Sequence, residues 1–226
     1  MQLPFIIRAL SRYLATDRVI CIIKEEKRLN DYIILYRCDP ATRASHYNLE
    51  GYLLIRKMTH ANIGDYNQAN EEFMVIGRIV PRYENDCWSY TEELYSEPYS
   101  KQYEDEDIHT SYIDNERKVV FFYYVDNRCV GQIRMSSSWN GYAFIEDLGI
   151  CRDYRRQGIG KRLLEHAIAW AEQHRLIGLA LETQDVNVLA CRFYARNGFV
   201  IGGVDTMLYS KFSTAHEKAI FWYYML

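Results

Sequence analysis

The chain has 226 residues, of which 49% are apolar, and a formal net charge of −3. This length predicts one domain, or one domain with an extension, and the apolar fraction allows a sizeable core. The slightly acidic balance and the lack of a basic stripe argue against nucleic acid as the main partner.

Membrane insertion, secretion and metal binding are also disfavoured. No apolar run approaches the roughly 20 residues that a membrane-spanning helix needs. The first apolar residues precede Arg8 and Arg12, whereas a signal peptide has its charges before its apolar core. The six cysteines are far apart and form no C-x-x-C pair, which is typical of reduced thiols rather than of zinc ligands. We therefore expect a cytoplasmic protein without a bound metal.

Residues 1–50 differ from the rest of the chain. They contain more Arg and Lys than Asp and Glu, and the apolar runs Val19–Ile23 and Tyr32–Tyr36 could form strands. No motif in this segment indicates a chemistry. We expect an N-terminal extension of unknown role over residues 1–50 and the main domain over residues 51–226.

The main domain begins with two apolar runs and an acidic segment. Tyr52–Met58 predicts a strand, and Phe73–Val80 predicts another that stops at Pro81. From Arg82 to Asp107 the chain holds nine carboxylates and two basic residues. Two interpretations of this segment stay open: a solvated acidic helix and loop, or an electrostatic funnel for a polycationic substrate.

An antiparallel meander and two helices follow. The β-branched and aromatic run Lys118–Val125 predicts a strand, and Asn140-Gly141 indicates a tight turn. The apolar residues after Gly160 recur at helical spacing. The other expected elements are strands over residues 129–135, 142–150, 176–181, 199–203 and 219–226 and a helix over residues 187–197. This order predicts a mixed α/β fold.

The motif Arg155-x-x-Gly158-x-Gly160, between the strand and the first helix, suits phosphate binding. Glycines let the backbone approach a ligand, the first N–H groups of a helix bind anions, and arginine is a bidentate partner. A helix that merely starts with glycine after a basic turn would give the same pattern. The motif is neither a Walker loop nor the dinucleotide fingerprint, so we expect another phosphate ligand.

A second motif follows in a matching order: Leu181–Asn187, then Ala190, then Phe193–Phe199. Together the two motifs resemble the GNAT (Gcn5-related) N-acetyltransferases. Three shorter stretches are similar to the streptothricin acetyltransferases within that family: Ile76–Pro81, Leu181–Asp185 and Val204–Tyr209. The resemblance covers residues 52–226. It implies a GNAT-type α/β fold with a mixed, mostly antiparallel sheet flanked by helices.

The resemblance implies acetyl transfer from acetyl-CoA to an amine of streptothricin, on its β-lysine moiety, and hence antibiotic resistance. The first alternative is the same reaction on a protein lysine, a protein N-terminus or a polyamine. The second alternative is a non-catalytic acetyl-CoA-binding module. The expected partner is a cationic small-molecule amine, and a homodimer is one option for the assembly.

The resemblance also assigns residues to the carrier. Tyr194 would protonate the leaving sulfur, Asn187 would contact the pantetheine arm, and the backbone of Leu148 and Ile150 would pair with that arm. The pyrophosphate would lie against Arg155, Arg156, Gln157, Gly158, Ile159, Gly160 and Lys161. A packing role for Tyr194 and a helix cap at Asn187 stay open as the simpler interpretations.

The acceptor amine must lose a proton, and a carboxylate can take it. An alkyl amine has a pKa about 3 units above neutrality, so deprotonation costs on the order of 4 kcal/mol. Glu146 and Asp147 are adjacent in a strand, so they should point to opposite faces and at most one should enter the site. We favour Glu146 as the base and keep Asp147 as the alternative. Glu182 and Asp205 are further candidates for binding substrate ammonium groups, or they are simple surface charges.

Overall fold

The computed structural model describes residues 55–107 and 110–226. The extension expected over residues 1–50 lies outside these ranges, so the boundary at residue 50 stays a prediction. The strands are, in chain order, β1 (Ile55–Lys57), β2 (Phe73–Glu84), β3 (Cys87–Lys101), β4 (Lys118–Val125), β5 (Arg128–Ser137), β6 (Tyr142–Ile150), β7 (Gly178–Gln184), β8 (Val200–Asp205) and β9 (Ala219–Met225). The helices are α2 (Ile159–Gln173) and α3 (Val188–Arg196), with short 3-10 turns η2 (Ile63–Asp65), η3 (Thr110–Tyr112) and η4 (Arg152–Tyr154).

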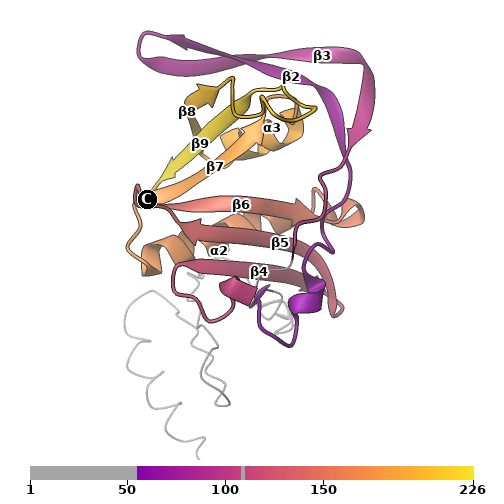
Figure 1. Cartoon of the computed structure of the whole chain (residues 1–226), viewed down its shortest axis with the longest axis vertical. Helices are drawn as coiled ribbons and strands as arrows, with labels where there is room; N and C mark the ends of the chain where they lie inside the picture. Colours follow the sequence, from indigo (N-terminus) through magenta and orange to yellow (C-terminus); the bar gives the residue numbers. More distant parts are fainter. Residues whose placement is uncertain (1–54, 108–109) are drawn as a thin grey trace, which may run out of the picture. The chain divides into compact units, whose positions relative to one another are not determined.

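One mixed sheet organises this part of the chain (Figure 1). Its strands lie in the order β1-β4-β5-β6-β7-β9-β8. All neighbours are antiparallel except β6 and β7, which are parallel and joined through α2. The expected mixed, mostly antiparallel sheet with flanking helices is thereby confirmed. No helix in the described ranges is long and apolar enough to cross a membrane.

Strand β4 is buried on both faces. Val119, Phe121 and Tyr123 belong to the main core, together with apolar residues of α2, α3 and the central strands. The alternate residues Val120, Phe122 and Tyr124 belong to a second cluster with Met58, Tyr66 and Tyr112. Because both faces are covered, β4 reads as an unbroken apolar run instead of an alternating one.

Residues 73–101 form a separate two-stranded hairpin, drawn in purple and magenta in Figure 1. The expectation of an acidic helix and loop is therefore wrong for most of the segment 82–107. The turn residues Asn85 and Asp86 have φ angles of 52° and 58°, as tight two-residue hairpin turns require. Strand β2 also continues past Pro81. The N–H of Ile79, two residues earlier, points away from β3 to the Asp185 carbonyl, so Pro81 removes no bond to β3.

Ion pairs attach the hairpin to the elements around β7. The Arg192 guanidinium of α3 makes two hydrogen bonds to the Glu92 carboxylate, one of them from Nε at 2.8 Å. Lys101 Nζ lies 2.6 Å from Glu217 Oε1, just before β9. These contacts fix the end of β3, so the residues that follow it lie at the carboxyl end of β7, where the Tyr103 hydroxyl donates to Gln184 Oε1.

Candidate active site

Strands β6 and β7 pair over only half of their length. Their register runs from Tyr142 opposite Gly178 to Ile145 opposite Leu181 and ends there. Beyond this point β7 continues with β9, and β6 continues with β5 as far as Ile150. The backbone of residues 146–150 therefore has no partner on the β7 side. An extended ligand arm could pair with this strand edge at Leu148, whereas the Ile150 carbonyl already accepts from Arg155 Nε at 2.8 Å.

A β-bulge in β6 brings two carboxylates to the opening. Arg134 pairs with Asp147, but the next residue, Met135, pairs with Ile145, so Glu146 is an extra residue in the ladder. A bulge interrupts the regular alternation of side chains. Glu146 and Asp147 both line one pocket of about 280 Å³. The expectation that they point to opposite faces is wrong, because it assumed an uninterrupted strand.

The pocket is strongly acidic. Its walls come from residues 132 and 134 of β5, residues 145–148 of β6, residues 181–184 of β7, the first turns of α3, and the segments 66–70 and 103–106. Its carboxylates are Glu104, Glu106, Glu146, Asp147 and Glu182, and Arg134 is the one Lys or Arg among the lining residues that the structure describes. This excess of negative charge attracts cations and raises their local concentration.

Glu146 is held as the partner of Arg134. The Ser136 hydroxyl donates to Glu146 Oε1 at 2.5 Å, and the Tyr112 hydroxyl donates to Oε2. Arg134 Nε lies 3.1 Å from Oε2, an ion pair whose alignment falls short of a hydrogen bond. Three donors thus crowd this carboxylate and leave it little capacity to accept a substrate proton.

Asp147 has a different environment. Gln132 Nε2 donates to Asp147 Oδ2 at 2.6 Å. Burial raises the pKa of the Asp147 carboxyl above its usual value, and the hydrogen bond from Gln132 and the charge of Arg134 oppose that rise. A carboxylate with a raised pKa and a neutral side-chain partner is better suited to take a proton near neutral pH. The contacts therefore favour Asp147, the alternative base in the sequence analysis, over Glu146.

Tyr194 and Asn187 lie in the pocket wall that α3 provides. The Tyr194 ring packs edge-on against Phe193 and Phe199, and burial raises the pKa of Tyr194 above its usual value, so its hydroxyl keeps its proton at neutral pH. Asn187 is the N-cap of α3, because its Oδ1 accepts from the Ala190 N–H at 3.2 Å. Capping uses only the oxygen, so the Asn187 amide nitrogen can still contact a ligand.

The glycine-rich loop has the backbone that an anion site needs. Gly158 has a φ of 83°, a left-handed conformation that favours glycine. A Cβ added to Gly160 would lie 3.1 Å from the Phe193 ring, so the second glycine lets α2 pack closely against α3. No side chain caps the start of α2, and the first N–H groups of a helix are free to bind an anion.

The Arg155 side chain binds the protein instead of pointing to solvent. Its Nε donates to the Ile150 carbonyl at 2.8 Å, Nη1 to the Glu72 carbonyl at 2.8 Å and Nη2 to the Glu71 carbonyl at 3.2 Å. The guanidinium thus anchors the loop, and its expected bidentate contact with phosphate stays a prediction. Arg156 and Lys161 are exposed at the loop and are placed to reach a ligand.

The two remaining acidic candidates, Glu182 and Asp205, lie in different places. Glu182 lines the pocket, accepts from the Tyr209 hydroxyl, and has a carboxyl pKa raised by burial. Asp205 is absent from the lining. Its Oδ1 accepts from the N–H groups of Met207 at 2.7 Å and Leu208 at 3.0 Å, so the structure gives it a role in a turn.

Sequence reasoning missed the residues that hold the carboxylates. Gln132 and Arg134 are buried polar residues in β5, which is otherwise largely apolar. Two polar residues at alternate positions of a buried strand were the available signal, because a buried polar group needs a partner. No comparable pattern marks Tyr66, Asn67 and Asn70, which reach the pocket because the chain crosses close to β6. A Cβ on Gly149 would lie 2.9 Å from the Ala69 carbonyl oxygen, so glycine permits this crossing.

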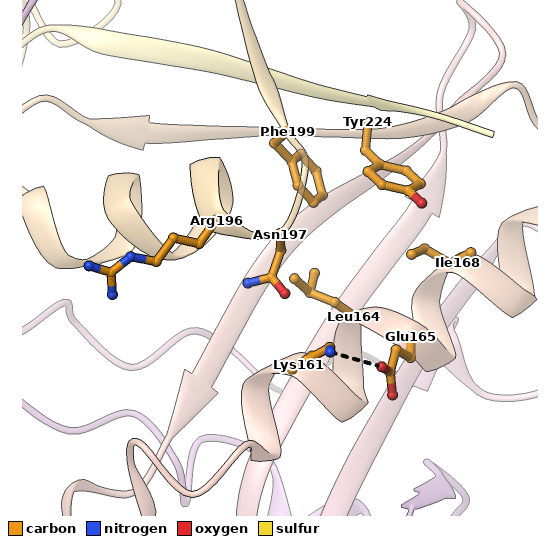
Figure 2. Close-up of a pocket in the computed structure, with 8 residues that line it drawn as sticks. All are labelled: Lys161, Leu164, Glu165, Ile168, Arg196, Asn197, Phe199 and Tyr224. Atoms are coloured by element: carbon orange, nitrogen blue, oxygen red, sulfur yellow. Dashed lines mark ion pairs between the residues drawn. The ribbon is translucent and has the colours of Figure 1, made fainter. Parts of the chain in front are cut away.

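A second pocket of about 320 Å³ lies between α2 and α3 (Figure 2). Residues of α2, including Lys161 and Ile168, form one wall, and Arg196, Asn197 and Tyr224 contribute to the other. It contains neither Tyr194 nor the carboxylates of β6. Tyr194 and the carboxylates of β6 are therefore together in the acidic pocket alone.

Comparisons with known proteins identify the family. A model of the Acetyltransferase (GNAT) family matches residues 87–199. Streptothricin acetyltransferase A of Bacillus subtilis (strain 168) is 56% identical over 171 residues, which cover 76% of this chain and 99% of that protein. Streptothricin acetyltransferase of Escherichia coli is 35% identical over 128 residues, which cover 56% of this chain and 71% of that protein.

Two solved acetyltransferase structures have a similar fold. A Bacillus anthracis protein assigned as a streptothricin acetyltransferase, crystallised in complex with acetyl coenzyme A, has a TM-score of 0.72 and 34% identity over 76% of this chain and 99% of its own. A nourseothricin acetyltransferase has a TM-score of 0.65 and 24% identity over 76% of this chain and 96% of its own, which shows the common fold.

Replacing Arg155 by Met should destabilise the protein. The change leaves three partly buried backbone carbonyls without their donor, which we expect to lower the free energy of unfolding by about 2–3 kcal/mol. Urea unfolding measures this loss. Arg156→Met is the matched control, because Arg156 is exposed and its variant should keep the parent stability. Equal stability of the two variants would contradict an anchoring role for Arg155.

Proposed function

The chain belongs to the acetyltransferase (GNAT) family, and from that membership we propose that it transfers the acetyl group of acetyl-CoA to an amine of streptothricin. The family model and the 56% identity over nearly the whole of one relative carry the membership. The acceptor we favour is the β-lysine moiety of the antibiotic. Acetylation removes the positive charge of the modified amine, and the outcome for the cell is resistance.

The charge of the pocket is the observation that carries the substrate class. Arg134 pairs with Glu106 and Glu146, which leaves Glu104, Asp147 and Glu182 without a cationic partner among the described residues. A substrate with more than one ammonium group could satisfy at least two of these carboxylates. Of the acidic segment over residues 82–107, Glu104 and Glu106 reach the pocket, so only its last part can act as a funnel.

Bound acetyl-CoA would supply the acetyl thioester. The start of α2 would hold its pyrophosphate through backbone N–H groups, and the free edge of β6 at Leu148 would align the pantetheine arm. This arrangement fits the structure, because the loop offers N–H groups without a side-chain cap and the strand edge has no β7 partner. The same edge leads to Asp147 and Tyr194.

The reaction needs two proton movements, and the pocket has a residue for each. Asp147 accepts the proton of the attacking ammonium group, so that the neutral nitrogen can form a bond to the acetyl carbon. Tyr194 donates its hydroxyl proton to the sulfur as the carbon–sulfur bond breaks. Solvent returns a proton to Tyr194 and removes one from Asp147. Glu182 would bind a further ammonium group of the antibiotic, with Tyr209 holding its carboxylate.

We place the reaction in the cytoplasm. The described cysteines Cys87, Cys129, Cys151 and Cys191 are all free thiols, which supports a reducing compartment.

The substrate is tested by mixing the purified protein with acetyl-CoA and streptothricin and following thiol release against a blank without acceptor. We expect rapid thiol release and a mass gain of one acetyl group on the antibiotic. Polyamines and lysine peptides are run in parallel. Preference for one of these amines, by kcat/KM, would overturn the streptothricin assignment and leave the reaction type standing.

Tyr194→Phe should lower kcat for acetyl transfer by about a hundredfold, because general acid catalysis typically contributes that much or more. The KM for both substrates should change little, since the ring and its packing remain. Tyr124→Phe removes another buried hydroxyl, in the second core cluster, and should keep the parent kcat. Full activity of Tyr194→Phe would remove it from the mechanism.

A further inference from the structure

We propose that Gln132 is a positioning residue that orients the Asp147 carboxylate toward the acceptor amine and keeps it able to accept a proton. The proposal rests on the proposed function, because Gln132 acts only through Asp147 as the base. Strand β5 would thereby give two adjacent carboxylates of β6 different roles, through a neutral partner at position 132 and a charged partner at position 134.

The orientation of the Gln132 amide is fixed by its contacts. Its side chain is buried, with 2% of the residue exposed. The backbone N–H of Asn67 donates to Gln132 Oε1 at 3.0 Å. A backbone N–H can only donate, so the amide oxygen must face Asn67 and the NH₂ group must face Asp147, where it donates to Oδ2 at 2.6 Å. A flipped amide would lose both bonds.

The hydrogen bond from Gln132 to Asp147 matters because the bulge interrupts the regular strand pairing next to Asp147. The extra residue Glu146 breaks the pairing immediately before Asp147, so strand geometry alone does not fix the direction of its side chain. Burial also favours the protonated form of the carboxyl, which cannot act as a base. A hydrogen bond that is given to the charged form opposes this effect and selects one side-chain direction.

Comparison with Arg134 shows why a neutral donor suits the base. Arg134 lies two residues further along β5 and holds Glu146 in an ion pair, which fixes that carboxylate as a structural charge. An arginine at position 132 would hold Asp147 in the same way and reduce its basicity. An apolar residue there would leave the carboxyl protonated at higher pH. The amide stabilises the carboxylate without a competing positive charge.

Other charged and titratable groups surround Asp147, and they stay in place when Gln132 is changed. They are Arg134 from β5, Glu106 from the segment after β3, Tyr66 from the segment after β1, Glu146 from β6 and Tyr194 from α3. Arg134 and Glu106 are paired with each other, so their opposite effects on Asp147 partly cancel. A change caused by Gln132 substitutions can therefore be assigned to the lost amide.

The test is the pH dependence of kcat/KM for streptothricin in two variants. Gln132→Met removes the donor and so raises the pKa of Asp147. The acid limb, which is the fall of kcat/KM at low pH, should move to higher pH by about one unit. At a pH below this limb, kcat/KM should therefore be about tenfold lower than in the parent protein. Gln132→Glu places a second carboxyl against Asp147, so the shift should reach about two units. Both variants should recover activity at high pH and bind acetyl-CoA with the parent affinity, measured by titration calorimetry.

Gln173→Glu, at the exposed end of α2, makes the same charge change away from the site and should leave the acid limb unmoved. Thermal unfolding of each variant separates misfolding from a kinetic effect, and if Gln132→Glu does not fold, Gln132→Met decides. A limb that stays in place in a folded Gln132→Met variant would overturn the proposal. If the parent protein does not acetylate streptothricin, the proposed function fails, and the same profiles measured with an accepted amine still test Gln132.

Discussion

The extra residue in β6 is the constraint on which the site depends. Regular pairing would send Glu146 and Asp147 to opposite faces of the sheet, and one of them into the core or solvent. The bulge at Glu146 instead lets both reach the acidic pocket. It occurs directly after the last pair between β6 and β7, so the carboxylates lie where the two strands separate. The carboxylates of β6 thus lie beside the part of the β6 edge that β7 leaves unpaired.

The surrounding elements serve this opening. Gly149 permits the segment around Ala69 to cross close to β6, which brings Tyr66 and Asn67 to the pocket. The β2–β3 hairpin is attached to α3 and to the segment before β9 through ion pairs, and it leads residues 103–106 across the carboxyl end of β7. Arg155 ties the glycine-rich loop to the backbone carbonyls of Ile150, at the end of β6, and Glu72, just before β2.

Local patterns in the sequence predicted most of the sheet. The strand Tyr142–Ile150 has the bounds that its turn signal and apolar content indicated, and the helix after Gly160 follows its periodicity. The first part of β2 was predicted, but β3 was missed because it carries exposed polar residues and pairs with β2 alone, so an acidic composition concealed the strand pattern. The bulge was unpredictable because it is a property of the register between β5 and β6. For the same reason the choice between Glu146 and Asp147 required the contacts of Gln132 and Arg134.

The most direct test compares the pH dependence of kcat/KM for streptothricin in the parent protein, Asp147→Asn and Glu146→Gln. Burial raises the pKa of Asp147, so the parent should lose activity as the pH falls through that raised value and protonates the base. The account predicts that Asp147→Asn removes this acid limb along with most of the activity, whereas Glu146→Gln keeps the limb. Loss of the limb in Glu146→Gln and its persistence in Asp147→Asn would contradict the account and return the base to Glu146.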